Sequence, residues 1–162
     1  AGGARAAVEH LLALGHDTVH HIAGPARSFA AAERERGWRA ALADAGRAVP
    51  EPTRGDWTSA SGHAAVSAMT DATAVFVAND QMALGALRAF ADAGRRVPED
   101  VAVVGFDDIV DAAEYRPPLT TVRQDFDALG ARAVRALVAA IEGGVPVAET
   151  VPATLVVRSS AR

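Results

Sequence analysis

The sequence contains no cysteine and no lysine, because all 16 of its Lys+Arg residues are arginine. The absence of cysteine excludes disulfide bonds, thiolate metal sites and cysteine nucleophiles. The absence of lysine excludes the phosphate-loop lysine, the Schiff-base lysine of pyridoxal enzymes and aldolases, and the lysine of receiver domains, since each of these needs an amine. Composition alone therefore excludes several large classes of enzyme.

Positive charge and long apolar runs are also scarce. The formal net charge is −4 at pH 7, and nowhere do more than two arginines adjoin, so the chain lacks the basic surface that nucleic-acid binding requires. No apolar run approaches the roughly 18 residues of a membrane span, and the first residues lack the order of a secretion signal. We expect a cytoplasmic protein without membrane contact, in which any contact with DNA is made by another segment.

What the sequence does contain is a regular alternation of helical and strand patterns. Its 162 residues, half of them hydrophobic, suffice for one domain or two small lobes. Apolar spacing predicts helices near residues 4–12, 30–45, 61–69, 82–93 and 126–141, and strands at 18–23, 74–78, 101–106 and 154–157. This order indicates an α/β fold, a doubly wound parallel sheet with helices on both faces.

Polar residues follow three of the predicted strands, at residues 24–28, 79–81 and 105–108. Ligands of such sheets bind outside the carboxyl ends of the strands. The sequence therefore predicts a binding site at this edge.

Several conspicuous residues also have plain structural explanations. His20 and His21 alternate along a predicted strand and point to opposite faces, so a metal site built on the pair is discarded. The charged residues 33–36 at a helix start are typical of a solvated face with salt bridges. Asp107 and Asp108 after a buried strand fit metal or acid-base chemistry, but a turn cap fits them at least as well.

Motifs of catalysis are missing. None of the six serines lies in a G-x-S-x-G elbow, and the glycines at positions 2 and 3 do not follow a strand as a phosphate cradle would. We therefore predict no catalytic residue, no metal site and no cofactor.

A set of binding residues remains: Arg34, Asn79 and Asp107, with Trp57 just after Gly55-Asp56. Arginine supplies a planar fork of donors, aspartate a pair of acceptors and asparagine one of each, which suits the vicinal hydroxyls of a sugar or the edge of a base. Trp57 can stack on the apolar face of a sugar. We predict a ligand site for a small polar molecule.

Seven ordered segments carry a resemblance that covers essentially the whole chain. They are residues 3–16, Ile22-Ala-Gly-Pro25, Arg34 followed by Gly37-Trp38, Gly55-Asp-Trp57, residues 77–86, Val103-Val-Gly-Phe-Asp-Asp108, and Pro117-Pro-Leu-Thr-Thr-Val122 followed by Gln124-Asp-Phe126. In these segments the chain resembles the ligand-binding core of the LacI/GalR family of bacterial transcriptional regulators.

The resemblance implies a two-lobed, periplasmic-binding-protein-like architecture, with the ligand between the lobes. Residues 1–122 would form the C-terminal lobe, residues 123–144 a helix crossing toward a mostly absent N-terminal lobe, and residues 145–162 a return strand. It further implies that Arg34, Asn79 and Asp107 hydrogen-bond the effector and that Trp57 packs against it. Two further ligand-binding positions, near the lobe crossover, are Gln124 and Phe126.

The function that the resemblance implies is effector sensing, without catalysis, by a transcriptional repressor. The effector would be a small molecule, with a carbohydrate expected, and operator DNA would be bound only through a helix-turn-helix head that these residues do not include. Two alternatives remain: a periplasmic-type sugar-binding protein of a transport system, which would carry a secretion signal, and an α/β enzyme using Asp107 or Asp108.

The resemblance also implies a homodimer, with contacts from residues 82–93 and the loop before Pro117. Independently, the helix at 126–141 carries six large apolar side chains on one stripe, whose exposure to water would put on the order of 10 kcal/mol at stake. We expect another copy, exchange with a partner, or N-terminal-lobe sequence to cover this stripe.

Overall fold

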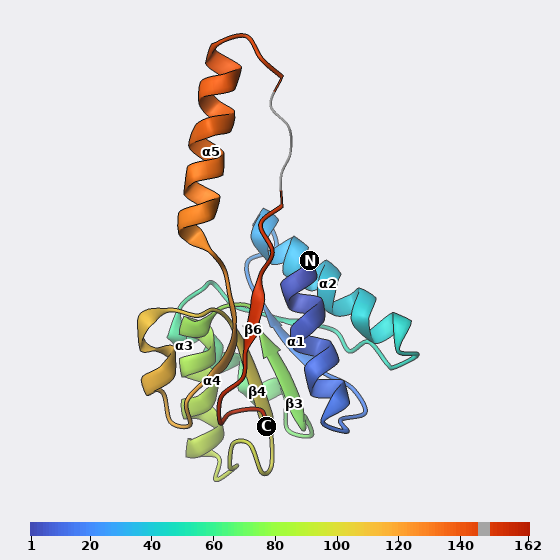
Figure 1. Cartoon of the computed structure of the whole chain (residues 1–162). Coiled ribbons are helices and arrows are strands. Elements are labelled where there is room, and N and C mark those ends of the chain that lie inside the picture. Colours follow the sequence, from blue (N-terminus) through green and yellow to red (C-terminus); the bar gives the residue numbers. More distant parts are fainter. Residues whose placement is uncertain (146–149) are drawn as a thin grey trace.

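The computed structural model describes residues 1–145 and 150–162 and shows the predicted alternation of helices and strands (Figure 1). The strands are β1 (His20–Ala23), β2 (Thr53–Arg54), β3 (Ala74–Val77), β4 (Ala102–Asp107), β5 (Thr120–Arg123) and β6 (Thr154–Val156). The helices are α1 (Gly2–Ala13), α2 (Phe29–Asp44), α3 (Ser59–Ala65), α4 (Asp80–Asp92) and α5 (Phe126–Ile141), with 3-10 turns η1 (Val66–Ala68) and η2 (Val110–Glu114).

The strands form one sheet in the order β2-β1-β3-β4-β5-β6. All neighbours from β2 to β5 pair in parallel, and β6 runs antiparallel to β5. The strand order runs outward in both directions from the first strand, as in doubly wound sheets. The predicted α/β fold class is confirmed, with one antiparallel strand at the edge.

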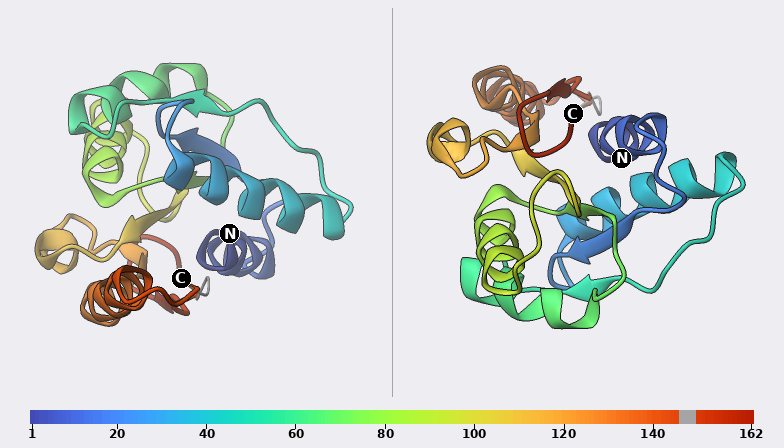
Figure 2. Two further views of the ribbon diagram at one scale, coloured as in Figure 1. Left: turned by 90° about the horizontal axis from the view of Figure 1, so that it is seen from above. Right: turned by 90° about the horizontal axis from the view of Figure 1, so that it is seen from below.

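Each face of the sheet has its own core, which explains why the strands are apolar throughout. In β3, Val75 and Val77 pack among α3, η1 and α4, whereas Ala74 and Phe76 pack against α1 and α2. Figure 2 shows these two pairs of helices on opposite sides of the sheet. Strands covered on both faces show continuous apolar runs instead of alternation.

The sequence patterns predicted most element positions but overlooked two short strands. β2 has only two residues and β5 reads Thr-Thr-Val-Arg, so neither shows an apolar run long enough to signal a strand. The single helix predicted at residues 61–69 is α3 followed by the tighter turn η1. These differences do not change the topology.

Helix α5 stands apart from the rest of the molecule. It follows β5 directly, so it leaves the sheet at the carboxyl edge, and Figure 1 shows it projecting well beyond the other helices. None of its residues is buried. The chain then comes back to the sheet as β6; within the predicted return segment 145–162, residues 146–149 lie outside the described residues. No helix among the described residues has both the length and the apolar character to cross a membrane.

Candidate ligand-binding site

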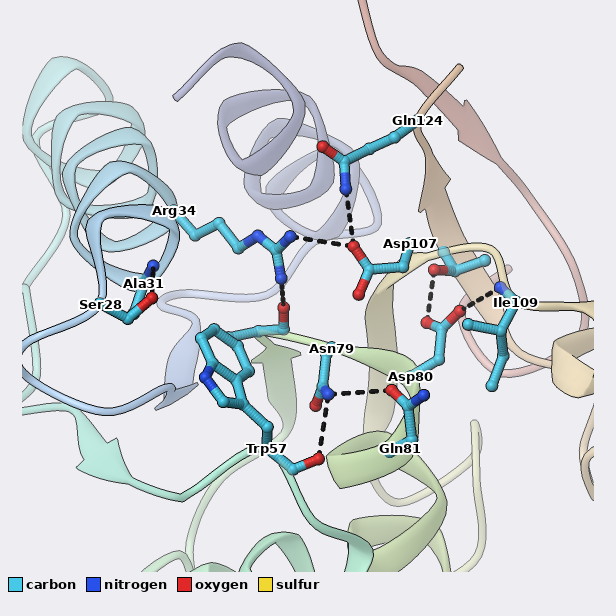
Figure 3. A network of polar contacts seen from close by, with 12 residues as sticks. Ser28, Ala31, Arg34, Trp57, Asn79, Asp80, Gln81, Asp107, Ile109 and Gln124 are labelled. Atoms are coloured by element: carbon cyan, nitrogen blue, oxygen red, sulfur yellow. Dashed lines mark hydrogen bonds and ion pairs between the residues drawn. The ribbon is translucent and has the colours of Figure 1, made fainter. Parts of the chain in front are cut away.

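Two neighbouring strands deliver Asn79 and Asp107 to the carboxyl edge of the sheet. Asn79 follows β3 and caps α4: its Oδ1 accepts a hydrogen bond from the backbone N–H of Met82 at 3.0 Å. Its Nδ2 donates to the Trp57 carbonyl oxygen at 3.0 Å and to Gln81 Oε1 at 2.9 Å (Figure 3). The cap that starts α4 therefore also fixes the loop that carries Trp57.

An ion pair between Arg34 of α2 and Asp107, the last residue of β4, crosses the site (Figure 3). Arg34 Nη2 lies 2.9 Å from Asp107 Oδ1, and Arg34 Nη1 donates to the carbonyl oxygen of Ala78. The guanidinium carbon lies 4.0 Å from the centre of the Phe106 ring and 5.5 Å from that of Trp57. Two aromatic rings and two acceptors thus hold the arginine in one orientation.

Both charges of this pair are largely buried. Removal from water lowers the pKa of Arg34 and raises the pKa of Asp107, while the attraction between the two groups opposes both shifts. Gln124, one residue beyond β5, donates from Nε2 to Asp107 Oδ1 at 2.7 Å. The Asp107 oxygen that faces Arg34 therefore also ties the site to the chain segment that enters α5.

Trp57 adopts a left-handed backbone conformation with φ of 77°. Its indole lies against the end of β1, where a Cβ on Gly24 would collide with Cη2 of the ring. Only glycine allows the ring to approach so closely. The only other non-glycine residues with positive φ in the described chain are Asp107 at 110° and Asp108 at 52°. Such conformations cost about 1–3 kcal/mol each and often mark functional sites.

These residues surround an open pocket of about 670 Å³, a size typical of small-molecule sites. Arg34, Trp57, Asn79 and Asp107 all line it. Gln124 is joined to the site by its hydrogen bond to Asp107. Phe126 is not brought into this pocket: it begins α5, is 55% exposed, and lines a neighbouring hollow with Gln124 and Thr154.

Sequence reasoning placed Ser28 at this edge, within residues 24–28, but did not single it out, and it missed other residues of the pocket wall. Ser28 caps α2 by accepting from Ala31 N at 3.3 Å, and Thr58 caps α3. Because each cap starts a helix at the carboxyl edge, helix-start signals are the pattern that could have found them. The remaining wall residues are Gln81, which lies in the predicted polar segment 79–81, and Ala30, Ser59 and Leu84, which the sequence did not indicate.

The salt bridges expected for residues 33–36 are present, but Arg34 in this group lines the pocket and does not belong to a solvated face. Glu33 pairs with Arg36 at 2.5 Å and Glu35 with Arg54 at 2.7 Å, while Arg34 between them pairs with Asp107. His21 is buried against Phe76, with ring centres 4.8 Å apart. Within residues 1–145 and 150–162 no group of three or more metal-ligating side chains is present.

Asp107 and Asp108 have separate tasks. Asp107 faces the pocket, whereas Asp108 is bound by Arg123 Nε at 2.6 Å and by Arg158 Nη2 at 2.7 Å. Burial raises the pKa of Asp108, but hydrogen bonds to the two arginines outweigh it and hold the pKa below its usual value. Since Arg123 precedes α5 and Arg158 follows β6, Asp108 joins the outgoing and returning segments.

Comparison with known proteins agrees with this fold. A family model described as a periplasmic binding protein-like domain matches residues 8–161. The lactose operon repressor of Escherichia coli strain K12 is 42% identical over 163 residues, covering 98% of this chain and 45% of that protein. The HTH-type transcriptional regulator CelR of Thermobifida fusca is 42% identical over 167 residues, covering 98% and 49%.

Solved structures give the same result. The transcriptional regulator CelR-cellobiose complex matches with a TM-score of 0.93 at 42% identity, over 98% of this chain and 51% of that one. A lac repressor dimer bound to operator and the anti-inducer ONPF matches with a TM-score of 0.89 at 40% identity, over 98% and 50%. The chain therefore spans about half the length of the curated relatives it matches.

The α/β sheet, the pocket at its carboxyl edge and the family match define a periplasmic-binding-protein-like domain. The chain belongs to the LacI/GalR family of regulators and aligns with their effector-binding region. The lactose operon repressor and CelR are transcriptional regulators, not enzymes or transport proteins, which favours an effector domain over a solute-binding protein.

Proposed function

We propose that this chain is the effector-sensing part of a transcriptional repressor, that its effector is a small carbohydrate, and that it performs no catalysis. The observation that carries the proposal is the pocket in which the Arg34–Asp107 pair, the Asn79 amide and the Trp57 indole meet. Support for a sugar comes from the CelR-cellobiose complex, which shares the fold closely.

The chemistry of the pocket suits a neutral polyol. Arg34 offsets the charge of Asp107, so the pair presents donors and acceptors without a net charge that would demand an ionic ligand. Both hydrogen bonds that the described residues give to the Asp107 carboxylate end on Oδ1, which leaves acceptor capacity for ligand hydroxyls. The Trp57 ring offers an apolar face to the C–H side of a sugar.

Gln124 and Phe126 would join the site from the crossover. Gln124 already contacts Asp107, and Phe126 lies two residues further on at the base of α5. If residues 1–122 form one lobe and 123–144 cross to another, both residues stand between the lobes. A ligand held there would contact both lobes at once, and so favour one relative arrangement of them.

DNA binding and dimerisation would belong to the larger protein. Operator DNA would be bound by a helix-turn-helix segment outside residues 1–162, in keeping with the net charge of −4. A homodimer is supported by the lac repressor dimer on operator. We place its contacts on α4 and the loop before Pro117. We infer a cytoplasmic location, as for regulators that act on the chromosome.

Calorimetric titration of the full-length protein with a panel of neutral sugars, cellobiose among them, tests the proposal. We expect one sugar to bind and Arg34→Ala to weaken it by about 1.5–3 kcal/mol, through loss of charge-assisted hydrogen bonds. Arg36→Ala is the matched control, because Arg36 lies on the same helix with its side chain 68% exposed and paired only on the surface. Unchanged affinity in Arg34→Ala, or no binding of any sugar, would refute the proposal.

A further inference from the structure

A fully buried carboxylate, Asp80, lies directly behind the pocket as the first residue of α4. Its Oδ1 accepts a hydrogen bond from Thr121 Oγ1 at 2.6 Å, and its Oδ2 accepts one from the backbone N–H of Ile109 at 2.9 Å (Figure 3). Asp80 does not line the pocket. It therefore has a defined set of protein partners and no direct route to a ligand.

The two hydrogen bonds join three of the segments that carry polar site residues, those of Asn79, Asp107 and Gln124. Asp80 itself follows Asn79, Ile109 lies two residues after Asp107, and Thr121 on β5 lies three residues before Gln124. Each partner is thus within three residues of a group that we assign to the effector. Removal of this one carboxylate would leave the strand pairing but would remove the side-chain link among the three segments at this point.

The loop bound by Asp80 needs such a restraint. Asp107 and Asp108, just before Ile109, both have positive φ, a conformation that non-glycine residues keep only when their surroundings hold it. β4 also passes close to the carboxylate, since a Cβ on Gly105 would collide with Asp80 Oδ1. The approach of strand and carboxylate is therefore as close as the backbone permits.

We propose that Asp80 is a positioning residue of the effector site: it contacts no ligand, but its hydrogen bonds to Ile109 and Thr121 hold the Asp107 and Gln124 side chains in their binding orientation. That the bound molecule is an effector rests on the proposed function. The hydrogen-bond geometry from which the proposal starts does not depend on that function.

The charge state of Asp80 sets the strength of these bonds. Burial, reinforced by repulsion from Asp107, raises the pKa of Asp80 to about 6, while the hydrogen bonds from Thr121 and Ile109 oppose the shift. The other charged or titratable groups that face it are Arg34 on α2 and Tyr115 after η2. Hydrogen bonds to an ionised acceptor are about twice as strong as neutral ones, so protonation loosens the restraint.

Four variants of the full-length protein test the role: Asp80→Ala, Asp80→Asn, Thr121→Val and the control Asp92→Asn. Asp80→Asn mimics the protonated carboxyl, because the amide can accept from Ile109 and donate to Thr121. Asp92 is matched to Asp80, since it ends the same helix in an exposed pair with Arg88. The probe is cellobiose, or whichever sugar of the panel binds.

At pH 7.5 we expect affinity to fall about tenfold in Asp80→Ala and about threefold in Asp80→Asn and Thr121→Val, with Asp92→Asn unchanged. The ratio of wild-type to Asp80→Asn affinity should shrink from about three to about one as the pH is lowered to 5. Asp107 is present in both proteins and cancels from this ratio. A ratio that stays constant with pH, or Asp80→Ala and Thr121→Val affinities within twofold of wild type, would overturn the proposal.

A ligand-free measurement separates this proposal from the proposed function. In Asp80→Ala, backbone amide exchange of residues 107–111 should quicken at least tenfold relative to α1, and Asp80→Asn should largely restore it. If no sugar binds the wild type, the proposed function fails and exchange alone decides. Unchanged exchange then overturns the role of Asp80, and faster exchange reversed by Asp80→Asn supports it. Thr121→Val decides in the same way if Asp80→Ala does not fold.

Discussion

Helices α4 and α5 have similar apolar stripes but opposite surroundings. α4 buries eight residues between the sheet and α3, whereas α5 buries none and keeps six large apolar side chains open to solvent. The residues exposed on α5 are Phe126, Leu129, Val134, Leu137, Val138 and Ile141. An amphipathic pattern therefore specifies which face of a helix is to be covered, but not which part of the protein covers it.

The largest expected effect is the difference in stability loss when one large apolar side chain is truncated on α4 and one on α5. Phe90→Ala on α4 removes a fully buried ring and should lower the free energy of unfolding of this chain by about 3–5 kcal/mol. Leu137→Ala on α5, where the leucine is 62% exposed, should change it by less than about 0.5 kcal/mol. Denaturant unfolding of the chain measures both.

The same two substitutions, measured in the full-length protein, test whether α5 is covered there. If N-terminal-lobe sequence covers α5, which is one of the three covers expected from the sequence, Leu137→Ala there should cost about 2 kcal/mol or more. Equal small effects in the chain and in the full-length protein would show that α5 stays uncovered in both. A large stability loss from Leu137→Ala in the isolated 162-residue chain would mean that another copy of the chain covers the stripe.

A second contrast concerns buried charge, which the sheet region has and α5 lacks. Because Asp80 has a folded pKa of about 6 against 3.8 for the free group, the native state binds more protons between these values. Stability from this group is present below pH 4 and is lost as the pH rises through 6. Asp80→Asn should therefore gain stability relative to wild type as the pH rises from 4 to 6.5, by at most about 3 kcal/mol.

Thermal unfolding of wild type, Asp80→Asn and Asp92→Asn across this pH range measures that gain. His21 runs in the opposite direction: burial lowers its pKa to about 4, so its contribution is lost as the pH falls through 6.5 to 4. Because His21 is present in all three proteins, its effect cancels from the differences. A difference that is flat with pH, or that changes sign, would show that Asp80 is not the group that titrates.

The smallest expected effect compares helix caps. Ser28 caps α2 and Asp125 caps α5, each by accepting from the backbone N–H three residues on. Ser28→Ala should lower the free energy of global unfolding by about 1 kcal/mol, since α2 unfolds with the core. Asp125→Ala should fray α5 and leave global unfolding of this chain unchanged. Amide exchange of α5 beside denaturant unfolding distinguishes local from global loss.

Sequence reasoning predicted the α/β order and the grouping of polar residues at the strand ends, because both follow from local patterns. Asn79 and Asp107 directly follow or end apolar strands, so parallel topology brings them to one edge. β2 escaped prediction because a two-residue strand exists only through its pairing with β1. Asp80 was placed at this edge within residues 79–81, but its burial was not foreseen, because an acidic residue in the first turn of a helix is usually an exposed partner of the helix dipole.

Phe126 was assigned to the site by the resemblance, but the described residues do not bring it into the pocket. It was predicted in the site beside Gln124, yet within the described residues it lines a separate hollow at the base of α5. Its role as a ligand contact stays a prediction, since that role requires the surface that would face α5. The sheet topology correctly located the residues at strand ends, such as Asn79 and Asp107, but it could not locate Phe126 on the projecting helix α5.

Ligand binding beside Trp57 is the central claim, and tryptophan fluorescence of the full-length protein during titration with the panel sugars tests it most directly. Of the chain's two tryptophans, Trp57 lines the pocket, while Trp38 is buried and donates to the Val19 carbonyl oxygen at 2.8 Å. We predict a saturable emission change with a binding sugar that disappears in Trp57→Phe. No change with any sugar, or a change that persists in Trp57→Phe, would contradict the account.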